Sequence, residues 1–128
     1  MNRTEDLLKL RPKIKRIKHE LASTVAEEFQ NRTLRPILKL QHDILVSLFH
    51  SCLSKHKIRF EELNQDEKES LINLLFQKDL AYRNQSIGIV IGLFTLEEYK
   101  HFAQEPGTNT KRITTMLKQR IISTYNTV

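Results

Sequence analysis

The stretch DEKESLINLLFQKDLAYRNQSIGIVIGL, from Asp66 to Leu93, decides the fold of this chain. It contains no proline, and at about 100° per residue its apolar side chains fill two adjoining sectors of a helix. So wide an apolar arc is typical of a helix at the centre of a domain. The stretch therefore predicts a central helix, either continuous or broken near Asn84. A buried β-strand at Ile87 to Phe94 is the alternative, because β-branched residues are frequent there.

Helix-capping patterns lie on both sides of this central stretch. Asn64 with Glu67, and Thr95 with Glu98, have the spacing of a capping box, in which each side chain accepts a hydrogen bond from the other residue's amide. The first pattern begins the central helix, and the second begins a short one. The helices expected after the centre are Leu96 to about Gln104 and about Thr110 to Tyr125, with a turn at Glu105 to Gly107 between them.

Two amphipathic helices are expected before the centre. The first is placed at Lys13 to Phe29, because apolar residues from Leu7 to Phe29 share one stripe and Pro12 either begins or kinks a helix. The second is signalled by Thr33 and Pro36 and should end near Lys57. Its apolar face comprises Leu34, Ile37, Leu38, Ile44, Leu45, Leu48, Phe49 and Cys52.

Composition agrees with a helical domain. The chain has 128 residues, and its 3 Gly and 3 Pro are too few for a turn-rich β protein. Its hydrophobic fraction of 39% is too high for a disordered chain. The predicted fold class is all-α, a compact bundle of five to six helices in a single domain over residues 1–128. Residues 1–30 form a basic amphipathic helix that could act as an arm, and residues 33–128 form the bundle.

The sequence favours a cytoplasmic protein. Cys52 is the single cysteine, so no intramolecular disulfide can form, as is usual in a reducing compartment. The N-terminus lacks the apolar core of a signal peptide, and no uncharged stretch reaches the length of about 18 residues that a membrane span needs. We therefore expect no membrane span.

Basic residues are concentrated at the two ends of the chain. The 21 Lys and Arg exceed the 15 Asp and Glu, and six of the ten residues from Lys9 to Lys18 are basic while none is acidic. Such a run is either a solvated helix face or a surface for an acidic partner. We expect a non-enzymatic helical module for protein interaction or self-association, with a protein partner or a homo-oligomer. Non-specific nucleic-acid binding is the alternative, and its candidate phosphate contacts are Lys13, Lys15, Arg16, Lys18, Lys111 and Lys118.

Four polar residues fall where the pattern places the core. Gln41, Asp79 and Arg120 lie on predicted apolar faces, and Arg83 follows Asp79 by one helical turn. Because buried polar groups need partners, we expect these four to form one network with the Asp79 carboxylate paired to guanidinium groups. The network either fixes helix register or binds an anion. A small-molecule lyase or hydrolase centred on Asp79 and Arg83 is a further alternative.

Signals for other chemistry are weak. Glu98 and His101 form one Glu-x-x-His pair, whereas a di-iron bundle needs two, so the sequence predicts no metal site and no cofactor. Cys52 and His56 lie one turn apart, a spacing that allows an imidazole to activate a thiolate. A position on the apolar face makes Cys52 a small core residue instead, and no catalytic residue is assigned.

Part of the chain resembles a family of short bacterial proteins without established function, whose members often carry the label glyoxalase. The resemblance spans about Thr33 to Arg120 and leaves the N-terminal helix outside. The label implies paired βαβββ modules with metal ligands on strands, and the family offers no known site to transfer. The stretches that carry the resemblance are TLRPILKLQH (33–42), QKDLAYRN (77–84), GIVIGLFTLEEY (88–99) and RITTML (112–117).

Overall fold

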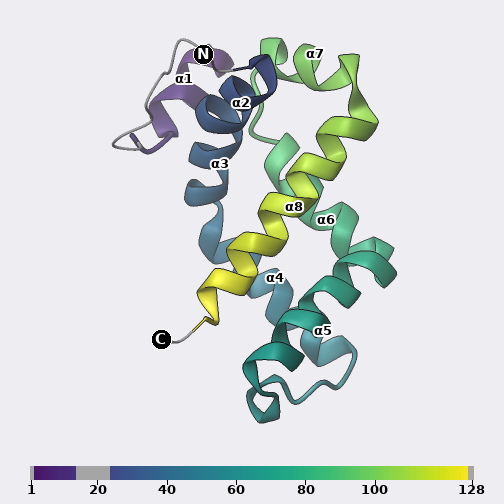
Figure 1. Ribbon diagram of the computed structural model, residues 1–128. Helices are drawn as coiled ribbons and strands as arrows, with labels where there is room; N and C mark the ends of the chain where they lie inside the picture. The colour runs from purple at the N-terminus through teal and green to yellow at the C-terminus, as the bar shows by residue number, and fades with distance from the viewer. Residues whose placement is uncertain (1, 14–23, 127–128) are drawn as a thin grey trace.

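The computed structural model describes residues 2–13 and 24–126, and these residues form helices and connecting segments without a β-strand (Figure 1). The all-α prediction is confirmed, and the helical segments are more numerous than the five or six expected. The α-helices are α1 (Arg3–Leu10), α2 (Val25–Phe29), α3 (Arg35–Leu40), α4 (His42–Lys55), α5 (Gln65–Lys78), α6 (Leu80–Ile91), α7 (Leu96–Gln104) and α8 (Pro106–Thr124); a π turn covers Gln30–Leu34 and a 3-10 turn covers Phe60–Glu62.

The central stretch is two helices, α5 and α6, and the break lies at Asp79 rather than near Asn84. Asp79 has an extended backbone, with φ −91° and ψ 90°, and its carboxylate accepts the Tyr82 amide at 3.0 Å as the N-cap of α6. Aspartate is among the preferred N-cap residues, because its oxygen satisfies an amide that has no partner inside the helix. Ile87 lies within α6, so the strand alternative is wrong.

Helix α8 holds the bundle together. It runs diagonally across the molecule in Figure 1 and packs against α5, α6 and α7. Its inner face carries Ile113, Leu117 and Ile121, each about 1% exposed. The helix begins at Pro106, within the segment expected to be a turn, because proline needs no amide partner in the first turn of a helix. Other fully buried large side chains of the core are Leu34, Ile37, Leu45, Phe49, Ile72, Phe76, Val90 and Phe94.

The N-terminal segment is not the continuous helix expected at Lys13 to Phe29. Helix α1 ends at Leu10, because Pro12 restricts the preceding Arg11 to an extended backbone (φ −72°, ψ 130°). Residues 14–23 of the expected helix lie outside the described residues. Thr24 is extended and caps a new helix, α2, by accepting the Glu27 amide at 3.1 Å. Val25, expected on the apolar stripe, is 72% exposed.

Helix α1 is tied to the start of α7 through one carboxylate. Arg11 forms an ion pair with Glu98 and also donates to the Leu93 carbonyl at 3.2 Å. Thr33 donates to the same carboxylate at 2.7 Å, while the Thr95 amide completes the capping box at 2.8 Å. Burial alone would raise the pKa of Glu98, but these donors hold it below its ordinary value. Glu98 thus serves as a structural anchor.

The second expected helix is present but bent. A π turn precedes Pro36, and its wider hydrogen-bond spacing suits a residue that has no amide to donate. Gln41 interrupts the helix between α3 and α4, and its side-chain amide donates to the Ile89 carbonyl of α6 at 3.3 Å. Ile44, expected on the buried face, is 54% exposed. None of the described helices has the length and apolar character needed to cross a membrane.

Candidate functional site

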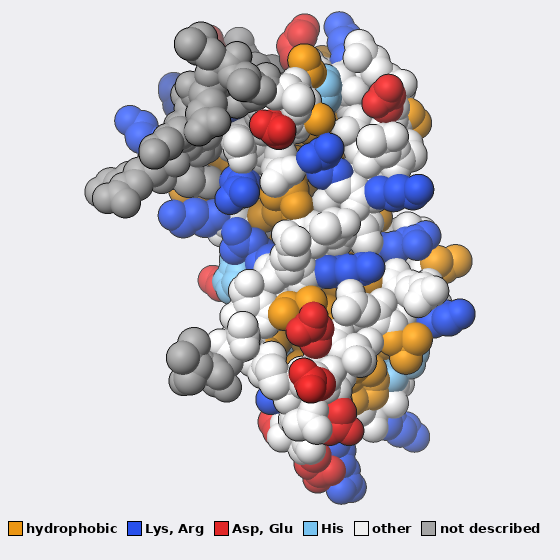
Figure 2. Space-filling view, in the orientation of Figure 1, with side chains coloured by type: hydrophobic (Ala, Val, Ile, Leu, Met, Phe, Trp, Pro, Cys, Tyr) orange, Lys and Arg blue, Asp and Glu red, His pale blue; other side chains and the backbone are white. Residues whose placement is uncertain are grey.

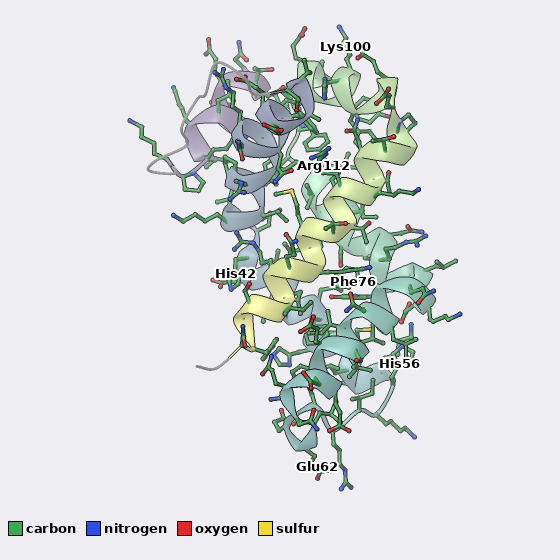
Figure 3. The ribbon with its side chains drawn as sticks, in the orientation of Figure 1. His42, His56, Glu62, Phe76, Lys100 and Arg112 are labelled. Carbon is green, nitrogen blue, oxygen red and sulfur yellow. The ribbon has the colours of Figure 1, made fainter. Side chains whose placement is uncertain are left out.

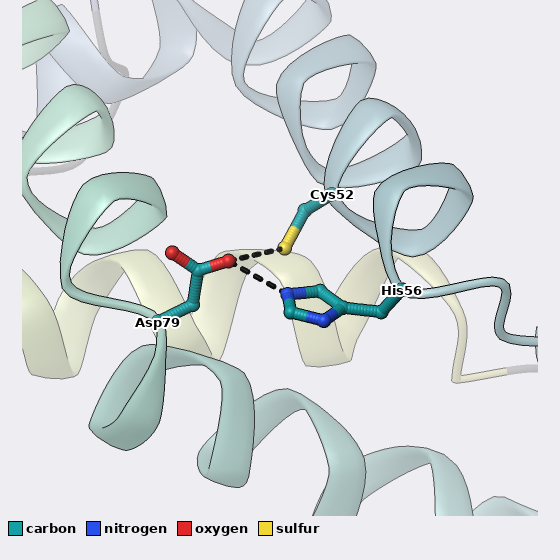
Figure 4. A group of neighbouring side chains, drawn as sticks. All are labelled: Cys52, His56 and Asp79. Atoms are coloured by element: carbon teal, nitrogen blue, oxygen red, sulfur yellow. Dashed lines mark hydrogen bonds and ion pairs between the residues drawn. The ribbon is translucent and has the colours of Figure 1, made fainter.

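The candidate site lies where the C-terminal end of α4 meets the N-terminus of α6 (Figure 4). Cys52 and His56 are four residues apart, so both face the same side of α4. Asp79 approaches from the junction of α5 and α6. Figure 4 shows the three side chains pointing toward one another. Their ligand atoms, one from each residue, all lie within 4.8 Å of one another.

Asp79 is the hub of this cluster. Its Oδ1 accepts the Tyr82 amide, while Oδ2 accepts hydrogen bonds from His56 Nε2 at 2.7 Å and from Lys55 Nζ at 3.0 Å. The Cys52 thiol lies 3.6 Å from Oδ2 as a further donor. Because a carboxylate only accepts, His56 carries its proton on Nε2. The Tyr82 amide first, then His56 and Lys55, hold the pKa of Asp79 far below its usual range.

The same carboxylate keeps the thiol protonated. Burial first, and the negative charge of Asp79 second, raise the pKa of Cys52 to about 11. A catalytic triad built on cysteine would place the imidazole between thiol and carboxylate, so that it could take the thiol proton. Here Asp79 stands between Cys52 and His56. The order of the groups therefore excludes activation of Cys52 by His56 in this arrangement.

The three side chains instead match the donor set of a transition-metal site. Thiolate sulfur, imidazole nitrogen and carboxylate oxygen are the three ligand types that Zn²⁺ takes in proteins. Three protein ligands leave a fourth position of a tetrahedral ion open for water or substrate. The residues present therefore fit a divalent ion of this class.

Pockets lie on both sides of the cluster. The larger, of about 670 Å³, has a mostly apolar lining that also includes Asp79, His56 and two lysines. The smaller, of about 100 Å³, lies on the Cys52 side. Asp79 and Lys55 line both pockets, so the cluster is accessible to small ligands. The apolar wall of the larger pocket consists of Ile58, Leu71, Leu74, Leu75 and Leu80.

The four residues expected to form one polar network do not meet. Asp79 pairs with Lys55 and His56 of α4 instead of a guanidinium, because its place at the N-cap directs its carboxylate toward the end of α4. Gln41 contacts α6 by itself, through the Ile89 carbonyl. Arg120 of α8 donates to His42 Nδ1 at 3.2 Å. Arg83 is half-buried, and its Nε has no hydrogen-bond partner among the described residues.

The other expected site residues are dispersed. Lys13 and Lys111 are exposed and Lys118 is half-buried, whereas Lys15, Arg16 and Lys18 lie outside the described residues. The Glu98–His101 pair is used structurally, since Glu98 binds Arg11 and the His101 ring lies 4.4 Å from that of Phe29. In the sequence, the Cys52-x-x-x-His56 spacing was the signal for the cluster. Asp79, the third residue of the cluster, is brought to this pair only by tertiary contact.

Comparison with models of known families, with curated proteins and with solved structures finds no match for this chain.

Proposed function

We propose that this protein binds a divalent transition-metal ion of the zinc class through Cys52, His56 and Asp79. The observation that carries the proposal is the convergence of one sulfur, one imidazole nitrogen and one carboxylate oxygen within 4.8 Å. The soft thiolate selects against Mg²⁺ and Ca²⁺, which prefer oxygen ligands alone. The reduced thiol that this site requires is consistent with the cytoplasmic location expected from the sequence.

The charges of the cluster balance those of such an ion. Thiolate and carboxylate together carry two negative charges, which a divalent ion neutralises. In its absence, the Lys55 ammonium takes the place of the cation beside Asp79. The Lys55 side chain is 59% exposed, so it can turn into solvent when the ion enters.

Binding requires only a small rearrangement. Zinc–ligand bonds of about 2.0 to 2.3 Å place neighbouring ligand atoms of a tetrahedron roughly 3.3 to 3.8 Å apart. The Cys52–Asp79 distance of 3.6 Å already lies in this range, whereas the His56–Asp79 distance of 2.7 Å is too short. The His56 side chain is 39% exposed at the end of α4, and therefore has room to withdraw.

Proton release gives the first test. A thiol that is protonated in the metal-free protein must lose its proton to become a ligand, and a bound metal ion provides the driving force. We expect about one proton to be released per Zn²⁺ at about pH 7.5, measured by calorimetry in buffers of different ionisation enthalpy. Stoichiometric binding without proton release would show that Cys52 is not a ligand.

Co²⁺ titration of variants gives the second test. A thiolate–cobalt charge-transfer band should appear in the wild-type protein and be lost in Cys52→Ser, and His56→Gln should weaken binding at least about tenfold. The control is His50→Gln, which removes another exposed histidine of α4 outside the cluster and should leave the titration unchanged. Equal effects of His50→Gln and His56→Gln would contradict the proposal.

A substitution of Lys55 distinguishes a metal site from a purely structural ion pair. Lys55→Gln removes the competing ammonium, and should therefore tighten Zn²⁺ binding. If the cluster serves only to join α4 to α6, the variant will lower thermal stability and no saturable Zn²⁺ binding will be found in either protein.

The interaction module expected from the basic N-terminal segment stays a prediction, since residues 14–23 of that segment lie outside the described residues.

A further inference from the structure

A second site lies in a groove between α8 and the α2–α4 segment, separate from the Cys52–His56–Asp79 cluster. It consists of two adjoining pockets of about 480 Å³ and 390 Å³, which share Gln30, Met116 and Gln119 in their walls. The larger is also lined by Arg35, His42 and Arg120, and the smaller by Lys111 and Arg112. We propose that the larger pocket binds the phosphate group of a small organic phosphate monoester, between Arg35 and Arg120.

The first support is a concentration of positive charge. Among the residues that the structure describes, the lining of the two pockets includes three arginines and a lysine but no Asp or Glu. In Figure 2, Lys and Arg side chains gather across the middle of the visible face, over α3 and α8. Figure 3 shows Arg112 on the upper part of α8 and His42 beside its lower part.

The second support is the repulsion between the two positive charges of Arg35 and Arg120. Burial first, and the nearby charge of Arg35 second, lower the pKa of Arg120. No described carboxylate forms a salt bridge with either guanidinium. Arg120 donates instead to His42 Nδ1, which requires a neutral imidazole. Two like charges at one pocket are unfavourable until an anion bridges them.

The donors suit phosphate in particular. Guanidinium groups bind phosphate oxygens through paired hydrogen bonds, and the Gln119 amide and Ser123 hydroxyl, both in the same wall, can donate to the remaining oxygens. Leu38 and Met116 form an apolar part of the wall, which suits the organic part of the ligand. A volume of about 480 Å³ lies within the range of small-molecule sites.

The groove favours a small ligand over a nucleic-acid strand. Single-stranded nucleic acid is usually held by aromatic side chains that stack on its bases, in addition to basic groups. None of the described residues that line the two pockets is Phe or Tyr. Of the lysines expected to contact phosphates, Lys111 lines the smaller pocket and Lys118 lines neither.

The test uses phenyl phosphate, inorganic phosphate and a single-stranded oligonucleotide as probes, with binding followed by amide chemical-shift changes and calorimetry. Phenyl phosphate should bind at one site and more tightly than inorganic phosphate, because the ring can contact Leu38 and Met116. Arg35→Gln and Arg120→Gln should each weaken its binding at least about tenfold, since each removes charge-assisted hydrogen bonds. The matched control is Lys118→Gln, which removes one positive charge from α8 outside the pocket and should change affinity less than about twofold.

Three results would overturn the proposal. Equal weakening by Lys118→Gln would show that the general positive field attracts the anion. Oligonucleotide binding without phenyl phosphate binding would assign the groove to nucleic acid. A clear fall in the melting temperature of Arg35→Gln in phosphate-free buffer would show a structural role, because removing a repelling charge should leave stability unchanged or higher.

Discussion

Asp79 combines two roles at the scale of a single residue. One carboxylate oxygen caps α6 through the Tyr82 amide, and the other accepts from Lys55 and His56 of α4. The helix N-terminus and the two basic side chains all favour the ionised form. Burying a carboxylate without partners would destabilise the fold. With these partners the Asp79 carboxylate stabilises it, and it joins α4 to α6.

Two substitutions of Asp79 should separate these roles. An asparagine side chain keeps an oxygen for the Tyr82 amide but lacks the charge, so we expect Asp79→Asn to lower the free energy of unfolding by about 1 to 2 kcal/mol. Asp79→Ala should lower the free energy of unfolding by roughly 1 kcal/mol more, because the helix cap is lost as well. Urea denaturation at about pH 7 measures both values. Equal losses in the two variants would show that the cap contributes nothing.

The charge contribution of Asp79 should depend on pH in a defined direction. Its pKa is lowered in the folded state, so the stabilisation is fully present above the unfolded pKa of about 4 and is lost as the pH falls below it. The stability difference between wild type and Asp79→Asn should therefore shrink as the pH falls below about 4. A difference that stays unchanged down to about pH 2 would contradict this assignment.

Cys52 should be unreactive in the metal-free protein. Its pKa is raised from 9.0 to about 11, so the thiolate fraction at about pH 8 is about 100-fold lower than for an unperturbed thiol. Alkylation by iodoacetamide should therefore be at least about 100-fold slower in the folded chain than in urea, as followed by mass spectrometry. Comparable rates in the two states would show that neither burial nor the charge of Asp79 suppresses the thiolate of Cys52.

At the scale of an element, the end of α4 positions the site. The Lys57 amide donates to the Ser54 carbonyl and the Ile58 amide to the Leu53 carbonyl, at 3.1 and 3.0 Å. These two bonds form a Schellman motif, which ends a helix with one residue in the left-handed region. Lys57 occupies that position with φ 54°, although it has a Cβ. His56 precedes it, so the motif determines where the imidazole lies.

Glycine at position 57 should relieve the strain of this helix end. A left-handed backbone costs a residue with a Cβ roughly 1 to 2 kcal/mol, and part of the gain is offset by the greater freedom of glycine in the unfolded chain. We expect Lys57→Gly to raise the free energy of unfolding by about 0.5 to 1 kcal/mol in thermal or urea denaturation. Lys57→Ala, which keeps the Cβ, is the control and should give no such gain.

At the scale of the whole molecule, α8 connects the two ends of the bundle. It contacts α5, which follows α4 in the lower part of Figure 1, and α7 at the top. Buried residues of α2 to α8 belong to one apolar cluster. A chain with one continuous core of this kind is expected to unfold in a single cooperative step.

Shortening one side chain of α8 should therefore weaken the whole bundle. Leu117 is about 1% exposed. Leu117→Ala should lower the free energy of unfolding by about 3 kcal/mol, because apolar burial is lost and a cavity is left. Far-UV circular dichroism and tyrosine fluorescence should report the same lowered midpoint. Leu96→Ala is the control, since Leu96 is 69% exposed and the change should stay within about 0.5 kcal/mol. Two separate transitions would mean that parts of the bundle unfold independently.

The amino-acid sequence by itself determined the class of the fold and several helix boundaries. Periodicity and capping are local properties, so the Asn64–Glu67 and Thr95–Glu98 boxes could be read from residues three positions apart. The position of the break in the central stretch was not readable in this way. Aspartate and asparagine both cap helices well, and Asp79 rather than Asn84 takes the role because Lys55 and His56 of another helix also bind its carboxylate.

Only the tertiary structure decided the site. The Cys52–His56 pair is visible in the sequence, but Asp79 lies 23 residues beyond His56 and reaches it only because α4 ends beside the start of α6. The arginines expected as its partners lie elsewhere, since a long charged side chain can meet any of several neighbours and sequence does not specify which. Helices follow from interactions between near neighbours in the chain, whereas a site depends on how those helices pack.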